Sequence, residues 1–142
     1  MTDSADLALA RYLAEQAEGI ARRYFRAPGP GAETKGDGSP VTEADREIER
    51  ALRASIRAEH PGDAFIGKEF GAHGRGSSRH WVIDAIDGTA SFIAGDPEWS
   101  TLIALEEHGT VTVGMVSAPA LRRRWCGAAE CALGSGSRPR PC

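Results

Sequence analysis

The stretch that most constrains the fold of this chain is WVIDAIDGTASFIAGD, residues 81–96, where an apolar run meets two carboxylates and a glycine turn. Its first three residues predict a short buried strand, because aromatic and β-branched side chains suit a pleated sheet. Asp84 would then lie at the C-terminal end of that strand, and residues 87–89 would form a tight turn into a helix. The backbone N–H groups of such a turn bind anions, and carboxylates beside it suit Mg²⁺, which takes oxygen ligands from protein and phosphate.

The same letters also fit a turn that has no chemical role. An Asp87-Gly88 pair is common where the backbone needs a positive φ, and Thr89 can serve as a helix N-cap. Short motifs carry a large risk of false matches, so spacing alone leaves both interpretations open.

Length and charge narrow the class of protein. The 142 residues and the 41% hydrophobic content are typical of one globular domain with its own core. Residues 1–121 carry 12 basic and 19 acidic side chains, a net charge of −7, whereas residues 122–142 carry five arginines and one glutamate, a net charge of +4. An acidic body argues against a nucleic-acid partner, and no apolar run reaches the roughly 18–20 residues of a membrane span.

The ends of the chain favour a cytoplasmic location. The N-terminal segment has no basic region before an apolar one, which argues against a secretory signal. Cys126, Cys131 and Cys142 all lie in the last 17 residues, a distribution unlike a disulfide framework, and no histidine has zinc-site spacing to them.

Two helices are predicted before the central stretch. Residues 5–27 repeat apolar side chains near the helical period, and a Gly- and Pro-rich loop follows. Lys35 in that loop is either a solvated charge or faces a cleft and helps to hold an anion. Thr42 begins the second helix with capping-box spacing to Asp45. Capping explains Asp45 by itself, and a role in a site requires that it face Thr89.

Short strands are predicted around the central stretch. Lys68 and Glu69 directly follow the predicted strand 64–67, so they form a second polar pair at the end of a strand. The Gly- and Ser-rich residues 71–79 predict a loop, and residues 126–142 predict a disordered tail because no period survives there. The predicted strands are residues 64–67, 100–105, 110–117 and 121–125, of which the last three form an antiparallel meander.

Five segments follow one another along the chain: KGDGSPVTEAD, FIGKEFG, WVIDAIDGTASF, WSTLIAL and VGMVSAPALRRRW. Together they resemble the inositol monophosphatase superfamily, and most closely its actinobacterial-type histidinol-phosphatases. The resemblance covers about the first half of that fold. It implies an α+β protein with two N-terminal helices on a mostly antiparallel sheet, the truncated first part of a layered αβαβα arrangement. Residues 1–125 would form this domain.

The resemblance implies Mg²⁺-dependent hydrolysis of a phosphate monoester, of histidinol-phosphatase type in histidine biosynthesis. The alternatives are an inositol monophosphatase or a related sugar-phosphate phosphatase, and a non-catalytic remnant or partner-binding domain. In such sites metal ions bind phosphate oxygens and lower the pKa of a bound water. The implied partner is a small phosphorylated substrate, without nucleic acid or membrane. Apolar surface that a second domain would cover also predicts self-association, as in a homodimer.

Site residues carry over from the family one by one. Metal ligation falls to Asp84, Asp87 and the Ile86 carbonyl, with position 68 as a further ligand position. Gly88 and Thr89 would bind the substrate phosphate, and the Thr89 hydroxyl would orient the attacking water. Asp45 would support Thr89, and Glu69 would be the second acid of a Gly-Glu-Glu motif. Lys35 would lie near the mouth of the cleft.

The chain departs from the family pattern where it matters most. Lys68 replaces the metal-binding glutamate of the family pattern. An ammonium there would repel Mg²⁺, at a cost on the order of several kcal/mol. Ala85 replaces a proline, which loosens the turn, and residues 90–91 are Ala-Ser in place of Lys-Asn. The chain ends before the C-terminal domain that carries the last metal-binding aspartate. The abrupt change of composition after residue 125 predicts a frame shift or a truncated gene.

Overall fold

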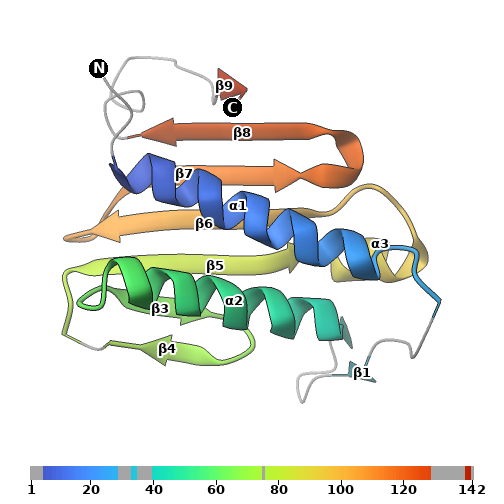
Figure 1. Cartoon of the computed structure of the whole chain (residues 1–142), viewed down its shortest axis with the longest axis horizontal. Coiled ribbons are helices and arrows are strands. Elements are labelled where there is room, and N and C mark those ends of the chain that lie inside the picture. Colours follow the sequence, from blue (N-terminus) through green and yellow to red (C-terminus); the bar gives the residue numbers. More distant parts are fainter. Residues whose placement is uncertain (1–4, 29–32, 35–39, 75, 129–139, 142) are drawn as a thin grey trace.

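The structure is a computed structural model of the chain, and it describes residues 5–28, 33–34, 40–74, 76–128 and 140–141 (Figure 1). The helices are α1 (Ala5–Tyr24), α2 (Glu43–Glu59), α3 (Thr89–Ala94) and the 3-10 turn η1 (Pro119–Leu121). The strands are β1 (Glu33–Thr34), β2 (Pro40–Val41), β3 (Ala64–Gly67), β4 (Gly71–His73), β5 (Arg79–Asp87), β6 (Ser100–Glu107), β7 (Thr110–Ala118), β8 (Arg123–Ala128) and β9 (Arg140–Pro141).

Seven strands form one sheet in the order β4-β3-β5-β6-β7-β8-β9, and β1 pairs with β2 separately. Neighbours in the large sheet are antiparallel, except that β3 and β5 run parallel. The predicted mostly antiparallel α+β fold is therefore confirmed. Because β3 and β5 point the same way, their C-terminal ends lie at the same end of the sheet.

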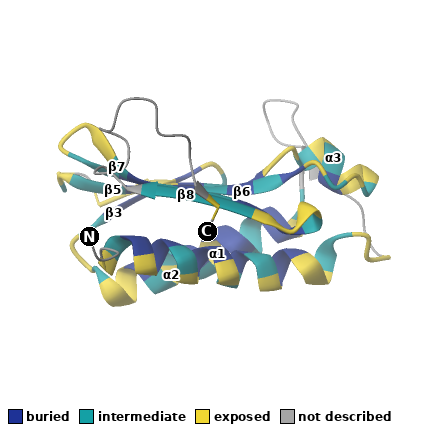
Figure 2. Ribbon diagram, turned by 90° about the horizontal axis from the view of Figure 1, so that it is seen from above, coloured by how far each residue is buried: buried dark blue, intermediate teal, exposed yellow. Residues whose placement is uncertain are grey.

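The two long helices lie side by side on one face of the sheet, as Figure 2 shows from above. Their apolar stripes are buried against it, and Leu13, Leu52 and Trp81 have no exposed area. Burial of each large apolar side chain contributes about 1.5–3 kcal/mol, so these stripes hold the layers together. α1 ends before the predicted residue 27, because Arg26 adopts a φ of 60°, a left-handed conformation that ends helices. No helix in the described segments is long and apolar enough to cross a bilayer.

The central strand is longer than predicted. β5 continues to Asp87, so Asp84 lies inside the strand and not at its C-terminal end. The register with β6 shifts between Asp84 and Asp87, and a bulge of this kind bends a strand without ending it. Buried Thr101 donates its hydroxyl to the Ala85 carbonyl at 2.8 Å and so gives the bulge a fixed backbone partner.

Part of the predicted loop 71–79 is a strand. β4 pairs antiparallel with β3 and returns the chain to the end of the sheet where β5 begins. Its three residues are all exposed and glycines with positive φ lie at Gly71 and Gly74, so the sequence shows no alternating pattern there.

The start of the predicted tail is ordered. β8 runs past the predicted boundary at residue 125 to Ala128, and residues 140–141 pair with it as β9. Hydrogen bonds between backbone groups hold these strands together, so the sequence need not show an alternation of apolar side chains there. Cys126 is disulfide-bonded, which the spacing of the cysteines did not predict. Residues 129–139 and 142 lie outside the described part of the chain, and the frame shift stays a prediction.

The sheet face opposite the helices is apolar, and neither long helix covers it. Ile66 and Val82 lie opposite each other on β3 and β5, and they are 38% and 37% exposed. Ala104 and Gly114 continue the same row across β6 and β7. A hollow of about 490 Å³ lies over this row.

Candidate functional site

The parallel pairing of β3 and β5 brings two of the expected site residues together beside the C-terminal end of β3. Lys68, directly after β3, places its Nζ 3.3 Å from Oδ2 of Asp84 on β5. The Lys68 side chain is 63% exposed and that of Asp84 is 18% exposed, and both line the hollow on the open face. Asp84 shares that face because side chains alternate along β5, where Ile83 and Ala85 are buried towards the helices.

The turn after β5 is built around Gly88. This residue adopts φ 86° and ψ 42°, and a β-carbon there would lie 2.9 Å from the Glu98 carbonyl oxygen. Only glycine meets both requirements without strain. Gly88 is also the N-cap of α3, so the alternative of Thr89 as N-cap is wrong. The Thr89 hydroxyl instead donates to the Ile86 carbonyl at 3.0 Å, which joins two of the predicted site groups.

The short helix α3 is held in place by the two residues that follow α1 and by Trp99. Phe92 on α3 packs against Phe25 and Trp99, with ring centroids 5.4 and 4.9 Å away. Arg26 donates its Nε to the Gly95 carbonyl at 2.9 Å. These contacts fix the helix that follows the Asp87 turn, and aromatic pairs of this kind contribute about 0.5–1.5 kcal/mol each.

Asp45 has the capping role that the sequence predicts. Its Oδ2 accepts hydrogen bonds from the Thr42 amide at 3.0 Å and the Thr42 hydroxyl at 2.8 Å, and its own amide donates to that hydroxyl. Asp45 is buried on α2. A supporting role towards Thr89 stays a prediction, and Lys35 lies outside the described residues.

Sequence reasoning missed the residue behind the Lys68–Glu69 corner. Glu49 on α2 is buried, and its carboxylate accepts hydrogen bonds from the backbone amides of Glu69 at 2.8 Å and Phe70 at 3.2 Å. Burial raises the pKa of the Glu49 carboxyl, while the two amides oppose that shift. The available signal was a charged residue beside Ile48, on the apolar side of a strongly amphipathic helix.

The described residues do not fit a magnesium site as they stand. Among them, no group of three or more His, Cys, Asp or Glu side chains is placed to hold a metal ion. The Lys68 ammonium already neutralises Asp84, and it comes from the position where the family resemblance predicts a carboxylate ligand. Asp87 is exposed beyond the bulge and does not line the hollow with Asp84.

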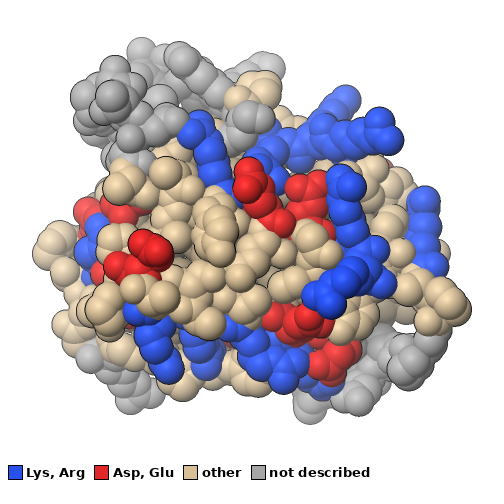
Figure 3. Space-filling model, viewed as in Figure 1, with Lys and Arg blue, Asp and Glu red and all other residues tan. Residues whose placement is uncertain are grey.

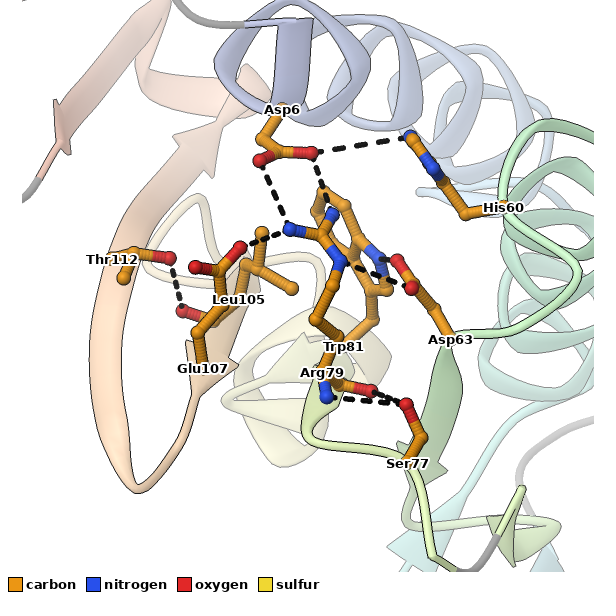
Figure 4. Close-up of polar contacts among 9 residues, drawn as sticks. All are labelled: Asp6, His60, Asp63, Ser77, Arg79, Trp81, Leu105, Glu107 and Thr112. Carbon is orange, nitrogen blue, oxygen red and sulfur yellow. Dashed lines mark hydrogen bonds and ion pairs between the residues drawn. The ribbon is translucent and has the colours of Figure 1, made fainter.

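The opposite end of β5 carries a dense ion network (Figure 4). Arg79 contacts Asp6 at 2.7 Å, Asp63 at 3.0 Å and Glu107, and the Trp81 indole donates to Asp63 at 2.9 Å. The hydrogen bond to Asp6, followed by the one to Asp63, raises the pKa of the Arg79 guanidinium. This cluster ties α1 to β5 and β6 (Figure 4), and it lies at the start of β5, whereas Asp87 lies at the end of that strand.

Charge on the helix-bearing face is mixed. Figure 3 shows acidic side chains among the basic ones over the described part of this face. Several of these charges pair with one another, for example Arg22 with Glu18 at 2.7 Å and Arg50 with Glu43 at 2.8 Å. Such a surface differs from the continuous basic stripe typical of nucleic-acid binding.

Known proteins resemble this chain over most of its length. It is 47% identical over 120 residues to a histidinol-phosphatase of Mycobacterium tuberculosis, a match that covers 84% of this chain and 46% of the relative. A solved inositol monophosphatase from Zymomonas mobilis is 43% identical with a TM-score of 0.72, over 89% of this chain and 49% of that one. A Thermotoga maritima IMPase is 28% identical with a TM-score of 0.81, over 97% and 51%.

These matches place the observed corner within a known fold. The chain spans about half the length of the relatives it matches. The model of the inositol monophosphatase family matches residues 3–135, which include both long helices and the strands that carry Lys68, Asp84 and Asp87. The chain therefore belongs to the inositol monophosphatase family.

Proposed function

We propose that this chain is the N-terminal part of a phosphate monoester hydrolase of the histidinol-phosphatase type, impaired by Lys68. The observation that carries the proposal is that the parallel strands β3 and β5 bring position 68 and Asp84 to one hollow, as the expected corner requires. The 3.3 Å contact between Lys68 and Asp84 supports the expected impairment. The 47% identity to a histidinol-phosphatase supports the reaction class.

In this proposal the phosphate binds at the turn after β5. The amides of Gly88 and Thr89 begin α3, where the first N–H groups of a helix lack partners within it. The Thr89 hydroxyl, fixed on the Ile86 carbonyl, orients the attacking water. Asp45 supports this turn from α2, and Glu69 acts as the second acid of the corner.

Lys68 changes the balance of charge that this chemistry needs. The inositol monophosphatase type of site would use Mg²⁺ on Asp84, Asp87 and the Ile86 carbonyl, but Lys68 already pairs with Asp84. We expect the chain to bind Mg²⁺ weakly and to turn over slowly. Groups from the part of the relatives beyond this match would complete the substrate pocket.

The second candidate is an inositol monophosphatase or related sugar-phosphate phosphatase. The solved Zymomonas mobilis inositol monophosphatase favours it, because it is nearly as similar to this chain as the histidinol-phosphatase is. The third candidate, a binding module without catalysis, is favoured by the Lys68–Asp84 pair itself.

The expected partners and location are also proposals. The exposed row of Ile66 and Val82 supports a homodimer that covers the open face, and sedimentation velocity tests it. The mixed charge of the helix face is consistent with no nucleic-acid partner. A cytoplasmic location also stays a proposal, and cell fractionation with thiol labelling of Cys126 is the test.

The deciding experiment compares the natural chain with Lys68→Glu and Lys68→Glu/Asp84→Asn. Isothermal calorimetry measures Mg²⁺ binding, and phosphate release is followed with histidinol phosphate and with inositol 1-phosphate. We expect Lys68→Glu to gain Mg²⁺ affinity and the double variant to lose it. Preferential release from one ester separates the first two candidates. If Lys68→Glu binds no Mg²⁺, Lys68 is not the main defect.

A further inference from the structure

A buried carboxylate stands behind the corner that carries Lys68. Glu49 is 1% exposed, yet it reaches from α2 to the backbone that follows β3. Its Oε2 accepts from the Glu69 amide at 2.8 Å and its Oε1 accepts from the Phe70 amide at 3.2 Å. Two amides in succession are thus held by the two oxygens of one side chain.

The surroundings of Glu49 are shaped to admit it. A β-carbon at Gly67 would overlap the Glu49 carboxylate, so the strand approaches the helix only because position 67 is glycine. Arg53 lies one helical turn on, with its Nη2 3.7 Å from Glu49 Oε1. The Arg53 guanidinium stacks over the rings of Phe65 at 4.9 Å and Phe70 at 5.4 Å.

A buried ion pair is a poor way to gain stability alone. Removing a carboxylate and a guanidinium from water costs more than their attraction often returns, and well-packed apolar residues frequently serve as well. Glutamine has one acceptor oxygen and could satisfy one of the two amides, whereas aspartate is too short to keep the same reach. The observed contacts therefore select glutamate for the shape of the turn.

We propose that Glu49 is a positioning residue for the Lys68–Glu69 corner. Its carboxylate fixes the backbone of residues 69–70, and this sets where the side chain at position 68 meets Asp84. The inference rests on the proposed function only for the use of that corner in phosphate chemistry. The positioning itself is a property of this chain that can be measured without turnover.

The first test is nuclear magnetic resonance on the full chain. We expect through-hydrogen-bond couplings from the Glu69 and Phe70 amide nitrogens to the Glu49 carboxyl carbon, and slow hydrogen exchange at both amides. Glu49→Gln should speed exchange at these two amides about tenfold, the effect of losing one hydrogen bond to a charged group. Glu59→Gln, which removes the same charge from an exposed position on α2, should leave them unchanged.

The second test measures position and not only stability. In a Lys68→Glu background, Glu49→Gln should weaken Mg²⁺ binding about tenfold by calorimetry, and Glu59→Gln should not. Exchange that rises evenly across α2, β3 and β5, with Mg²⁺ affinity unchanged, would overturn the proposal in favour of a purely structural role. Absence of the couplings in the natural chain would overturn it too, and that measurement needs no variant to fold.

The two tests separate this inference from the proposed function. If Lys68→Glu binds no Mg²⁺, the metal role of the corner fails, and the exchange rates at Glu69 and Phe70 still decide the role of Glu49. If Glu49→Gln does not fold, the couplings in the natural chain decide it.

Discussion

The two ends of β5 differ in how their carboxylates are neutralised. At the first end, one guanidinium, that of Arg79, joins Asp6, Asp63 and Glu107. At the other end, Asp84 meets one largely exposed ammonium. Among the described residues, the exposed Asp87 side chain has no hydrogen-bond or ion-pair partner.

This contrast separates two uses of the same residue type on one strand. The carboxylates around Arg79 come from α1, the segment before β3, and β6, and they share this one guanidinium as a fixed partner, so their charge stabilises the fold. Among the described residues, Asp84 near α3 pairs only with Lys68 and Asp87 pairs with none. Carboxylates without a full set of charged partners are expected where a chain has a functional site.

The largest effect is expected at the Arg79 end. Arg79→Met should lower the free energy of unfolding by about 3 kcal/mol, because three carboxylates lose their shared partner in a partly buried place. Chemical denaturation measures the loss. Arg57→Met, at an exposed position on α2, should cost less than about 0.5 kcal/mol. Equal losses in the two variants would mean that the Arg79 contacts stabilise the fold no more than an exposed charge does.

A second effect tests whether the corner near Asp84 is also tightly packed. Gly67→Ala should destabilise the chain by about 1–3 kcal/mol, since the added carbon overlaps Glu49 and the helix or the strand must move. Gly62→Ala is the matched control, because its added carbon meets nothing within 4 Å. Thermal unfolding of both variants is the measurement, and similar midpoints would mean that the corner tolerates displacement.

Neutralising single carboxylates sharpens the comparison directly. Asp63→Asn should cost about 1–2 kcal/mol, because Asp63 accepts from both Arg79 and the Trp81 indole. Asp87→Asn should change stability by less than about 0.5 kcal/mol, since it breaks no contact with the described residues. Urea titrations of the two variants give both numbers, and a costly Asp87→Asn would show that this end is structural as well.

The smallest effect concerns pH at the α3 end, where the Tyr24 hydroxyl donates to Glu47. That hydrogen bond lowers the pKa of the Glu47 carboxyl. Because the pKa is lower in the folded state, the carboxylate adds stability at any pH above its pKa in the unfolded chain. This stability is lost as the pH falls through the pKa of the folded state. Glu47→Gln should therefore cost a few tenths of a kcal/mol near neutral pH and less in acid. Denaturation across that range checks it, and a cost that grows in acid would reverse the assigned sign.

Local signals in the sequence predicted much of the fold. The capping box of Thr42 and Asp45 and the hairpin of β6 and β7 depend on residues close in the chain, and both are observed. The return strand β4 was missed because it is short and fully exposed. A bulge inside β5 was missed because it depends on the register with β6.

The candidate site was predictable in part, for the same reason. The family motifs pointed to Asp84 and to position 68, and the parallel pairing of β3 with β5 brings them together. Glu49 and Thr101 act through backbone groups far away in the chain, at Glu69 and Ala85. A single sequence carries no record of such partners, because hydrogen bonds to the backbone leave the identity of the partner residue unconstrained.

The direction of β3 has a consequence for how chains of this kind can vary. Since β3 and β5 run the same way, the corner does not depend on the length of the segment that joins them. That segment, β4 and the residues up to Ser78, passes along the outer border of the sheet and can lengthen or shorten without moving either strand end. Natural variation in loop size should therefore collect there, while the spacing within each strand stays constant.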